Sequence, residues 1–246
     1  MTYKNERLVV LDADGTTINA FDAIGKTFAQ HSMGLGDLVR FQQRHNLFKY
    51  LGGLKEFPLN ARHQINKKKR KALIRTLTEI YREEGELYAG IAGMIEKLLA
   101  VPSIRVGVVS RNVTLEPLVT LQQVFRRSGV DTGAFDFFVH LPLKEGKMEK
   151  FRDIRESFGI NPARAFACGD EKKDYLAATG SGMHPFMVSY GFESFERLEK
   201  KIGVPPELIS RSPAELRQRL LHALDIEDDL LDSTAGPVDE GRQQPV

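Results

Sequence analysis

The 246-residue sequence contains a single cysteine and no tryptophan. With Cys168 alone, the chain cannot close an internal disulfide, which favours a reducing compartment. No apolar run approaches the length of a membrane span. The first residues lack the charged-then-apolar pattern and the small-residue cleavage site of a secretory leader. We therefore expect a cytoplasmic protein with no membrane partner.

An excess of charge of one sign is also lacking, because the formal net charge is only +2. Such a balance gives no argument for nucleic acid or a membrane surface as a partner. The basic run NKKKRK, residues 66–71, is a local exception, but too few aromatic residues interleave it to support stacking on bases. We interpret it as a solvated helix end or a positive rim that steers anionic substrates. We expect no nucleic-acid partner, and a monomer or homodimer.

Five short apolar runs are present, and most of them end on a polar or acidic residue. Such runs are typical of strands buried on both faces of a parallel sheet. Helical patterns at 115–125 and 147–158 lie between them. This alternation predicts an α/β fold with a doubly wound, Rossmann-like parallel sheet, whose chemistry lies beyond the carboxyl ends of the strands. The runs are 8–11, 106–109, 135–139, 165–168 and 186–188.

The region between residues 18 and 87 breaks this alternation, because it contains helical stretches and Gly-rich turns but no convincing strand. We predict a mostly helical inserted domain there, carried by an α/β core that comprises residues 1–17 and 88–225. From residue 226 to 246 the chain is acidic and then rich in Gly, Gln and Pro. That composition cannot bury enough apolar surface to order itself, so we expect a flexible tail.

The stretch DADGT, residues 12–16, follows the first apolar run. Side chains two apart in extended chain point the same way. Two carboxylates about 4 Å apart would repel by roughly 4 kcal/mol at an effective dielectric near 20. An EF-hand loop is excluded, because Gly15 is the fourth residue rather than the sixth and Ala23 stands where a bidentate Glu is needed. The pair Asp12 and Asp14 therefore calls for a proton or a cation, although an Asp-Gly turn alone is common.

Three more segments follow in order: Ser110 in VVSRN, Lys147 in EGKMEK, and GDEKKD at residues 169–174. Together with DADGT they resemble the four motifs of the haloacid dehalogenase superfamily, phosphatase branch. The resemblance covers residues 6–20 and 88–225. It implies that the insertion at 18–87 is a helical cap, placed between the first and second motifs.

The chemistry of these residues is that of phosphoryl transfer. The carboxylate of Asp12 could attack phosphorus and form an aspartyl-phosphate. Asp14 could protonate the leaving oxygen and later activate water. Mg²⁺, which prefers oxygen ligands, fits Asp12, Asp170 and Asp174, although Asp174 could instead brace its neighbours through backbone amides. The resemblance adds the backbone carbonyl of Asp14 as a metal ligand.

Lys147 would hold the nucleophile and the phosphate by charge, and the Ser110 hydroxyl would bind a phosphoryl oxygen. We choose Lys147 over Lys144 and Lys150 because it begins the predicted helix and its distance to Asp170 fits the family's spacing. Taken alone, Ser110 could simply cap a helix. Another phosphate-binding pattern, AFDAIGKT at residues 20–27, is rejected, because the preceding strand already leads to the first motif and the would-be loop contains an aspartate.

These residues predict a Mg²⁺-dependent phosphomonoester hydrolase that acts on a small phosphorylated metabolite. In the family, dehalogenases generally lack the second aspartate, so Asp14 argues against dehalogenation. A phosphomutase or phosphonate hydrolase of the same superfamily is an alternative. A second alternative is a non-catalytic binding or regulatory module that uses the basic cap.

Substrate choice is expected to reside in the cap, which closes over such sites. Lys55, Arg62 and His63 are candidates there, and simple surface exposure is the competing interpretation for each. Arg111 and Asn112, next to Ser110, are further substrate-binding candidates that could face the leaving group. Phosphoglycolate, sugar phosphates and nucleotides all remain open, because the fold does not decide among them.

Overall fold

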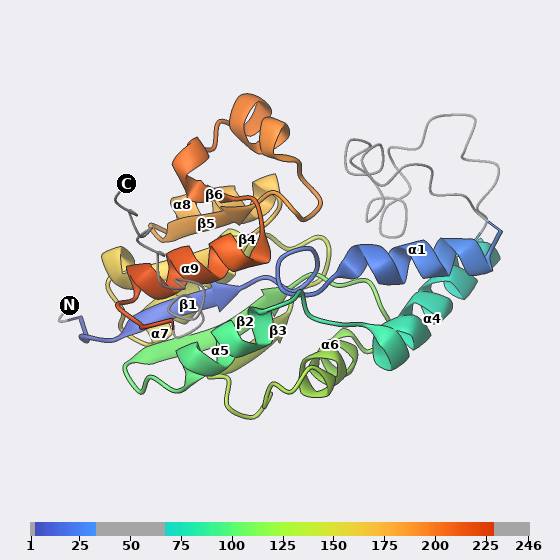
Figure 1. The fold of residues 1–246 in the computed structure, drawn as a ribbon, viewed down its shortest axis with the longest axis horizontal. Helices are drawn as coiled ribbons and strands as arrows, with labels where there is room; N and C mark the ends of the chain where they lie inside the picture. The colour runs from blue at the N-terminus through green and yellow to red at the C-terminus, as the bar shows by residue number, and fades with distance from the viewer. Residues whose placement is uncertain (1–2, 33–66, 229–246) are drawn as a thin grey trace, which may run out of the picture.

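The computed structural model describes residues 3–32 and 67–228 and is built around one parallel sheet (Figure 1). Its six strands are arranged in the order β3-β2-β1-β4-β5-β6, and every neighbouring pair is parallel. The doubly wound α/β fold expected from the apolar runs is thus confirmed. The strands are β1 (Arg7–Leu11), β2 (Ile104–Ser110), β3 (Phe137–His140), β4 (Ala165–Gly169), β5 (His184–Val188) and β6 (Ile209–Ser210).

Each of the five apolar runs contributes to a strand, but β6 was not predicted. Two residues, Ile209 and Ser210, are too few to show any periodicity, and they pair with the end of β5. The third strand also begins later than expected, at Phe137 rather than Phe135. The Phe135 ring packs edge-on against Phe125 and Phe138 instead.

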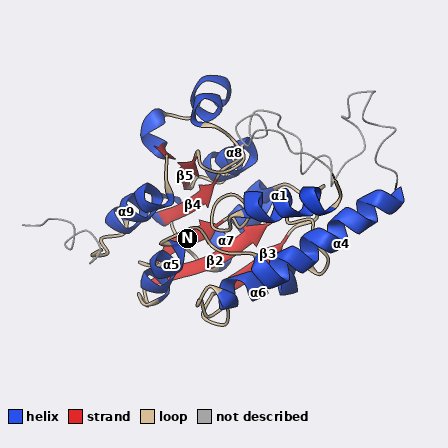
Figure 2. Ribbon diagram, turned by 45° about the vertical axis from the view of Figure 1, so that its right-hand side comes forward, coloured by secondary structure: helices blue, strands red, loops and turns tan. Residues whose placement is uncertain are grey.

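Helices cover both faces of the sheet (Figure 2). Alternate residues of β1 separate the two layers, since Val9 and Leu11 face one hydrophobic cluster and Leu8 and Val10 face the other. The first cluster involves α5, α6 and α9, and the second involves α7 and α8. The helices are α1 (Ala20–Gln30), α4 (Lys67–Glu84), α5 (Ile91–Leu99), α6 (Pro117–Arg127), α7 (Lys147–Ser157), α8 (Lys172–Gly180) and α9 (Pro213–Ala223).

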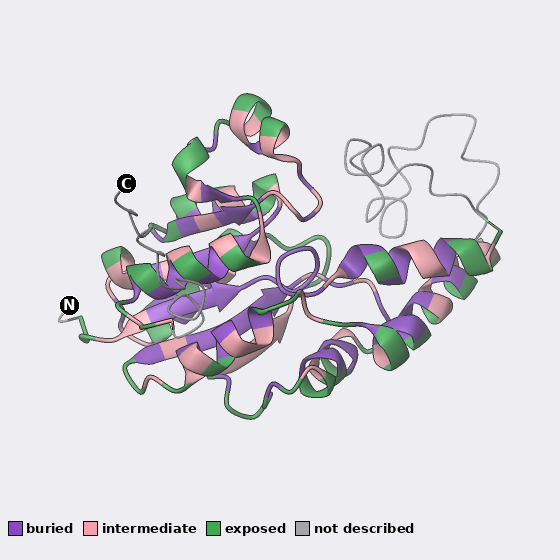
Figure 3. Cartoon of the chain, viewed as in Figure 1, coloured by how far each residue is buried: buried purple, intermediate pink, exposed green. Residues whose placement is uncertain are grey.

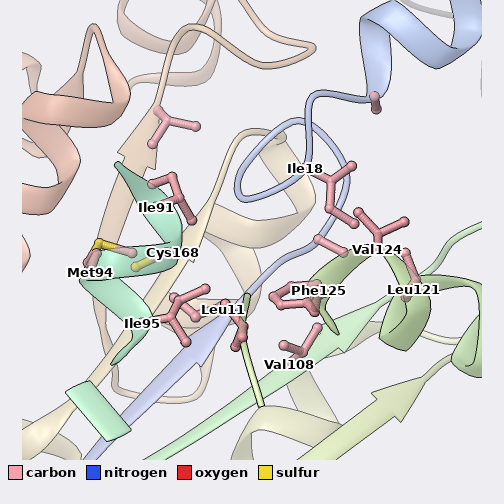
Figure 4. Packing of buried hydrophobic residues seen from close by; sticks show 14 of the residues in the cluster. Leu11, Ile18, Ile91, Met94, Ile95, Val108, Leu121, Val124, Phe125 and Cys168 are labelled. Carbon is pink, nitrogen blue, oxygen red and sulfur yellow. The ribbon is translucent and has the colours of Figure 1, made fainter. Parts of the chain in front are cut away.

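The larger cluster has its centre where three adjacent strands meet α5 and α6. Figure 4 shows Leu11, Val108 and Cys168 among the side chains of these helices. Figure 3 shows the same pattern along the chain: most residues of β1, β2 and β4 are buried, β3 is half-buried, and the outer faces of the helices are exposed. Burial also raises the pKa of the Cys168 thiol to about 12, so this cysteine is a packing residue with little thiolate. The strand ends that carry the acidic motifs are therefore fixed by a rigid core.

Two helices, α1 and α4, account for the described part of residues 18–87 (Figure 1). The rejected phosphate-loop pattern at 20–27 lies inside α1, and Lys26 within it pairs with Asp22 and Glu84. Most of the basic run forms the first turn of α4, where Lys68 and Lys71 are exposed. That placement agrees with a solvated helix end.

The inner face of α4 contributes Leu73, Leu77 and Tyr81 to the main hydrophobic cluster, together with α6. The substrate candidates Lys55, Arg62 and His63 lie outside the described residues. A separate cap over residues 18–87 stays a proposal.

The start of the expected tail is docked on the core. Ile226 packs against the main cluster. The carboxylate of Asp228 accepts hydrogen bonds from Arg217 of α9 at 2.8 and 2.6 Å. Because Arg217 is buried, it requires a partner of opposite charge, which composition alone did not indicate. The described chain therefore continues to Asp228, three residues past residue 225, where the predicted core ends. Residues 229–246 lie outside the described part.

In the described part of the chain, no helix combines the length and apolar character needed to cross a membrane.

Candidate active site

The DADGT loop turns back on itself immediately after β1. The Ala13 carbonyl accepts hydrogen bonds from the backbone N–H groups of Thr17 and Ile18 at 2.9 and 2.8 Å. Gly15 lies in this turn with φ +79°, and a Cβ there would come within 2.4 Å of Asp170 Oδ2. Only glycine accepts both the positive φ and the close approach. The turn therefore brings the first motif against the fourth.

Lys147, at the first residue of α7, joins two carboxylates. Its Nζ lies 2.8 Å from Asp12 Oδ1 and 2.6 Å from Asp174 Oδ1, and the side chain is only 1% exposed. Burial opposes the positive charge, but the two carboxylates outweigh it and raise the pKa of Lys147. Lys144 is exposed and Lys150 is only partly buried. The geometry therefore favours Lys147 among the three candidates.

Asp12, Asp170 and Asp174 form a buried carboxylate cluster, and one oxygen of each lies within 4.8 Å of the others. Asp170 accepts hydrogen bonds from the Thr16 hydroxyl at 3.2 Å and from the Phe192 N–H at 2.6 Å. Each oxygen of Asp174 has one partner, since its Oδ1 meets Lys147 and its Oδ2 accepts from the Glu171 N–H at 3.0 Å. These contacts agree with a bracing role, and the position of Asp174 in the cluster also agrees with a metal ligand, the two roles that the sequence left open.

Both donors to Asp12 reach the same oxygen. Its Oδ1 accepts from Lys147 and from the Ala13 N–H at 2.9 Å, whereas its Oδ2 has no hydrogen-bond partner among the described residues. The Lys147 ammonium pairs with two of the three clustered carboxylates, and the third, Asp170, has no cationic partner among the described residues. Hard oxygen donors with this uncompensated charge fit a divalent cation such as Mg²⁺. The residues present therefore suit the metal that the sequence predicted.

Burial and mutual proximity raise the pKa values of Asp12 and Asp170. Burial raises the pKa of Asp12 from 3.8 to about 7, although the Lys147 ammonium opposes this rise. Burial, with the nearby Asp12 and Asp174 carboxylates, also raises the pKa of Asp170 well above its ordinary value. In the absence of a cation the cluster thus retains protons near neutral pH.

We expect the metal-free protein to lose stability as the pH rises from about 4 to about 7. A carboxyl group with a raised folded-state pKa binds more protons when folded, so its contribution is complete below pH 4 and is lost as the pH passes the folded-state pKa. Thermal unfolding in EDTA at pH 5, 6, 7 and 8 measures this slope. The Asp12→Asn variant removes one titrating group and should flatten it. A wild-type slope equal to that of the variant would contradict the raised pKa of Asp12.

Asp14 lies beside this cluster, and its surroundings are different. Its Oδ1 accepts a hydrogen bond from the Tyr81 hydroxyl at 2.8 Å. The Asn112 amide donates to both carboxylate oxygens, at 3.1 and 2.9 Å. Burial raises the pKa of Asp14, and these hydrogen bonds oppose that rise.

The second motif contributes three neighbouring side chains with different surroundings. The Ser110 hydroxyl ends β2, is buried, and has no hydrogen-bond partner among the described residues. Arg111 lies 3.6 Å from Glu171 through its Nη2. The sequence predicted that Asn112 binds substrate. In the structure its side-chain NH₂ group donates to Asp14, and its Oδ1 accepts from the Thr114 N–H at 2.8 Å. The Ser110 hydroxyl is therefore left for a ligand, and the buried Nε of Arg111 likewise has no hydrogen-bond partner among the described residues.

Three contributors were missed at the sequence level. Tyr81 gave no signal, because it lies on α4, 67 residues from Asp14. The Phe192 N–H is a backbone group that no residue type reveals. Thr16, in contrast, belongs to the quoted DADGT stretch, and its hydroxyl could have been assigned to the fourth motif.

The chain is similar to known proteins in both sequence and fold. Residues 9–188 match a family described as haloacid dehalogenase-like hydrolase. A phosphoglycolate phosphatase of Vibrio vulnificus is 21% identical over 228 residues, which cover 88% of this chain and 96% of that protein.

Solved structures are similar at the level of the fold. A haloacid dehalogenase-like protein of Agrobacterium tumefaciens has a TM-score of 0.65 at 11% identity and covers 90% of this chain and 100% of its own. A haloacid dehalogenase-like hydrolase of Streptococcus pneumoniae has a TM-score of 0.58 at 16% identity, with 87% and 98% covered. CbbY of Rhodobacter sphaeroides, solved in complex with phosphate, has a TM-score of 0.52 at 19% identity, with 76% and 88% covered.

Proposed function

The chain belongs to the haloacid dehalogenase-like hydrolase family, and from that premise we propose that it is a Mg²⁺-dependent phosphomonoester hydrolase. The observation that carries this proposal is the pairing of Asp12 with Lys147, which leaves the Oδ2 of Asp12 without a partner among the described residues. A carboxylate oriented by a buried ammonium on one oxygen presents its other oxygen for attack on phosphorus.

The proposed reaction has two displacement steps. Asp12 Oδ2 forms a bond to phosphorus while the bond from phosphorus to the ester oxygen breaks, and Asp14 donates a proton to that oxygen. Asp14 then accepts a proton from water as the water oxygen attacks the aspartyl-phosphate and releases inorganic phosphate. Lys147 and the buried Ser110 hydroxyl supply positive charge and a hydrogen bond to the phosphoryl oxygens.

Asp12 and Asp170, with the backbone carbonyl of Asp14, are the residues that would hold Mg²⁺, and Asp174 would support them through Lys147 and the Glu171 N–H. When bound, the ion offsets the repulsion between the carboxylates and the phosphate dianion.

The substrate that we propose is a small phosphorylated metabolite. The Vibrio vulnificus relative is named a phosphoglycolate phosphatase, so phosphoglycolate is the first ester to test, followed by sugar phosphates and nucleotides. Arg111 follows Ser110 in the chain, lies 3.6 Å from Glu171, and is a candidate contact for the leaving group.

We expect the purified protein to hydrolyse para-nitrophenyl phosphate with Mg²⁺ and to lose at least about a hundredfold in rate with excess EDTA, since a bound cation stabilises the transition-state charge by several kcal/mol. Release of para-nitrophenol, followed by its absorbance, measures the rate. Added Mg²⁺ should restore it.

Equal rates with Mg²⁺ and EDTA would contradict the metal requirement. No hydrolysis of any phosphate ester by the folded protein would contradict the proposed function and favour the binding-module alternative. A salt titration of DNA binding would then test that alternative, because phosphate contacts give a steep salt dependence.

A further inference from the structure

Asp14 accepts more hydrogen bonds than the other carboxylates of the described site and, like Asp170, forms no ion pair with Lys147. Asp14 receives three hydrogen bonds from two uncharged side chains. Tyr81 donates to Oδ1 at 2.8 Å, and Asn112 donates to Oδ1 at 3.1 Å and to Oδ2 at 2.9 Å. Such a set of donors fixes the rotation of the carboxyl group about its Cβ–Cγ bond.

Both donors are themselves held in place. Asn112 is 2% exposed, and its side-chain Oδ1 accepts from the Thr114 N–H at 2.8 Å, which fixes the orientation of the side-chain amide. Tyr81 is fully buried in the hydrophobic cluster between α4 and the core. The positions of both donors are thus set by the fold rather than by a substrate.

Hydrogen bonds also tie α4 to the loop that carries Asn112. The Thr78 hydroxyl accepts from the Leu115 N–H at 2.9 Å, and Arg82 donates to the Thr120 hydroxyl at 3.0 Å. The two donors to Asp14 therefore belong to one connected unit, although they are far apart in the sequence.

The three hydrogen bonds distinguish the two oxygens of Asp14. A carboxylate has about two acceptor positions on each oxygen. Oδ1 uses both, one for Tyr81 and one for Asn112, whereas Oδ2 uses one, so that one acceptor position remains on Oδ2 among the described residues. A proton carried by Asp14 is thus directed to Oδ2.

We propose that Tyr81 and Asn112 are positioning residues, which orient Asp14 so that its Oδ2 exchanges the proton with the leaving-group oxygen and then with water. The inference rests on the proposed function. In the first step the proton moves from Oδ2 to the ester oxygen as the ester bond breaks. In the second step Asp14 Oδ2 takes a proton from water as the water oxygen bonds to phosphorus and the bond from phosphorus to Asp12 Oδ2 breaks, so that bonds and protons balance over the cycle.

The test uses leaving groups that differ in their need for a proton. Para-nitrophenolate leaves without help, whereas an alkoxide requires protonation. Tyr81→Phe removes only the hydroxyl and should lower kcat/KM for phosphoglycolate, or for the alkyl phosphate that the wild type hydrolyses fastest, by about tenfold or more. Its kcat/KM for para-nitrophenyl phosphate should stay within about twofold, because kcat/KM reports the first phosphoryl transfer and excludes the hydrolysis of the aspartyl-phosphate, which is common to both esters.

Tyr88→Phe is the matched control, because the Tyr88 hydroxyl is also buried but has no hydrogen-bond partner in the described part of the chain. It should leave both rates unchanged. In an Asp14→Asn background, Tyr81→Phe should cause no further loss, because its effect acts through Asp14. If Tyr81→Phe does not fold, Asn112→Ala serves instead, since it removes the donor to Asp14 without placing a second carboxyl group beside it.

The outcomes separate the inference from the proposed function. An equal loss of kcat/KM on both esters, no loss on either, or a loss that persists in the Asp14→Asn background would overturn the positioning role while the phosphatase activity stands. A folded wild type that hydrolyses no phosphate ester would overturn the proposed function and this inference with it.

Discussion

Replacing Asp12 by Asn is expected to lower kcat for para-nitrophenyl phosphate by at least about a thousandfold, because the variant lacks the oxygen that attacks phosphorus. The fold should survive, since the side chain keeps its size and the substitution removes one of the clustered buried carboxylates. The loss should be similar for good and poor leaving groups, in contrast to that of Tyr81→Phe, because no ester can bypass the nucleophile. Steady-state rates with saturating Mg²⁺ measure it.

The control for Asp12→Asn is Asp22→Asn, which neutralises an exposed aspartate on α1 that pairs with Lys26. It should retain wild-type turnover. A covalent phosphoryl group should also be trapped on wild-type protein by rapid acid quenching and be missing from the Asp12 variant. Wild-type turnover by Asp12→Asn would exclude the covalent route.

The second large effect concerns Lys147, whose replacement by Met should reduce both stability and activity. The variant leaves Asp12 and Asp174 buried without their cation, and breaking such a buried pair costs about 3–5 kcal/mol. For a protein of this size that corresponds to a fall in Tm of about 10 °C. Thermal unfolding in EDTA measures the fall. It should be smaller at pH 5 than at pH 8, because protonation relieves the unpaired carboxylates.

Lys144→Met and Lys150→Met are the matched controls, since these lysines flank Lys147 in the sequence but neither is buried. Both should keep the wild-type Tm and turnover. Lys147→Arg preserves the charge and should recover part of the lost stability, although its planar guanidinium is a poorer fit to two converging carboxylates. A fall in Tm for Lys144→Met as large as that for Lys147→Met would contradict the assignment of the buried ammonium.

The strands were predictable from the sequence for a physical reason. Strands such as β1 and β4 are buried on both faces, so their composition is apolar without interruption, and the polar residue that follows marks the carboxyl end. The strand β6 has two residues and contains no such signal. The same logic placed Asp12, Ser110 and Asp170 at one edge of the sheet.

The side chains that contact Asp14 could not be predicted from the sequence. The hydroxyl of Tyr81 and the amide of Asn112 reach it from positions 67 and 98 residues away, and no local pattern encodes such a distance. Asn112 was assigned to the substrate because it neighbours Ser110, yet both ends of its side chain are occupied by the protein. Composition also did not indicate the buried ion pair between Arg217 and Asp228, because its two residues are recognised as partners only in the folded chain.

The strand order has a consequence for how the chain is made. Asp12 follows β1, but β1 lies between β2 and β4, and β4 begins only at Ala165. At ordinary rates of synthesis the apolar β1 waits on the order of ten seconds for its second neighbour. During that time it is an unpaired edge on the nascent chain, open to chaperones and to other strands. The carboxylate cluster is therefore assembled late in biosynthesis, because a nascent chain that stops before residue 165 contains Asp12 and Lys147 but neither Asp170 nor Asp174.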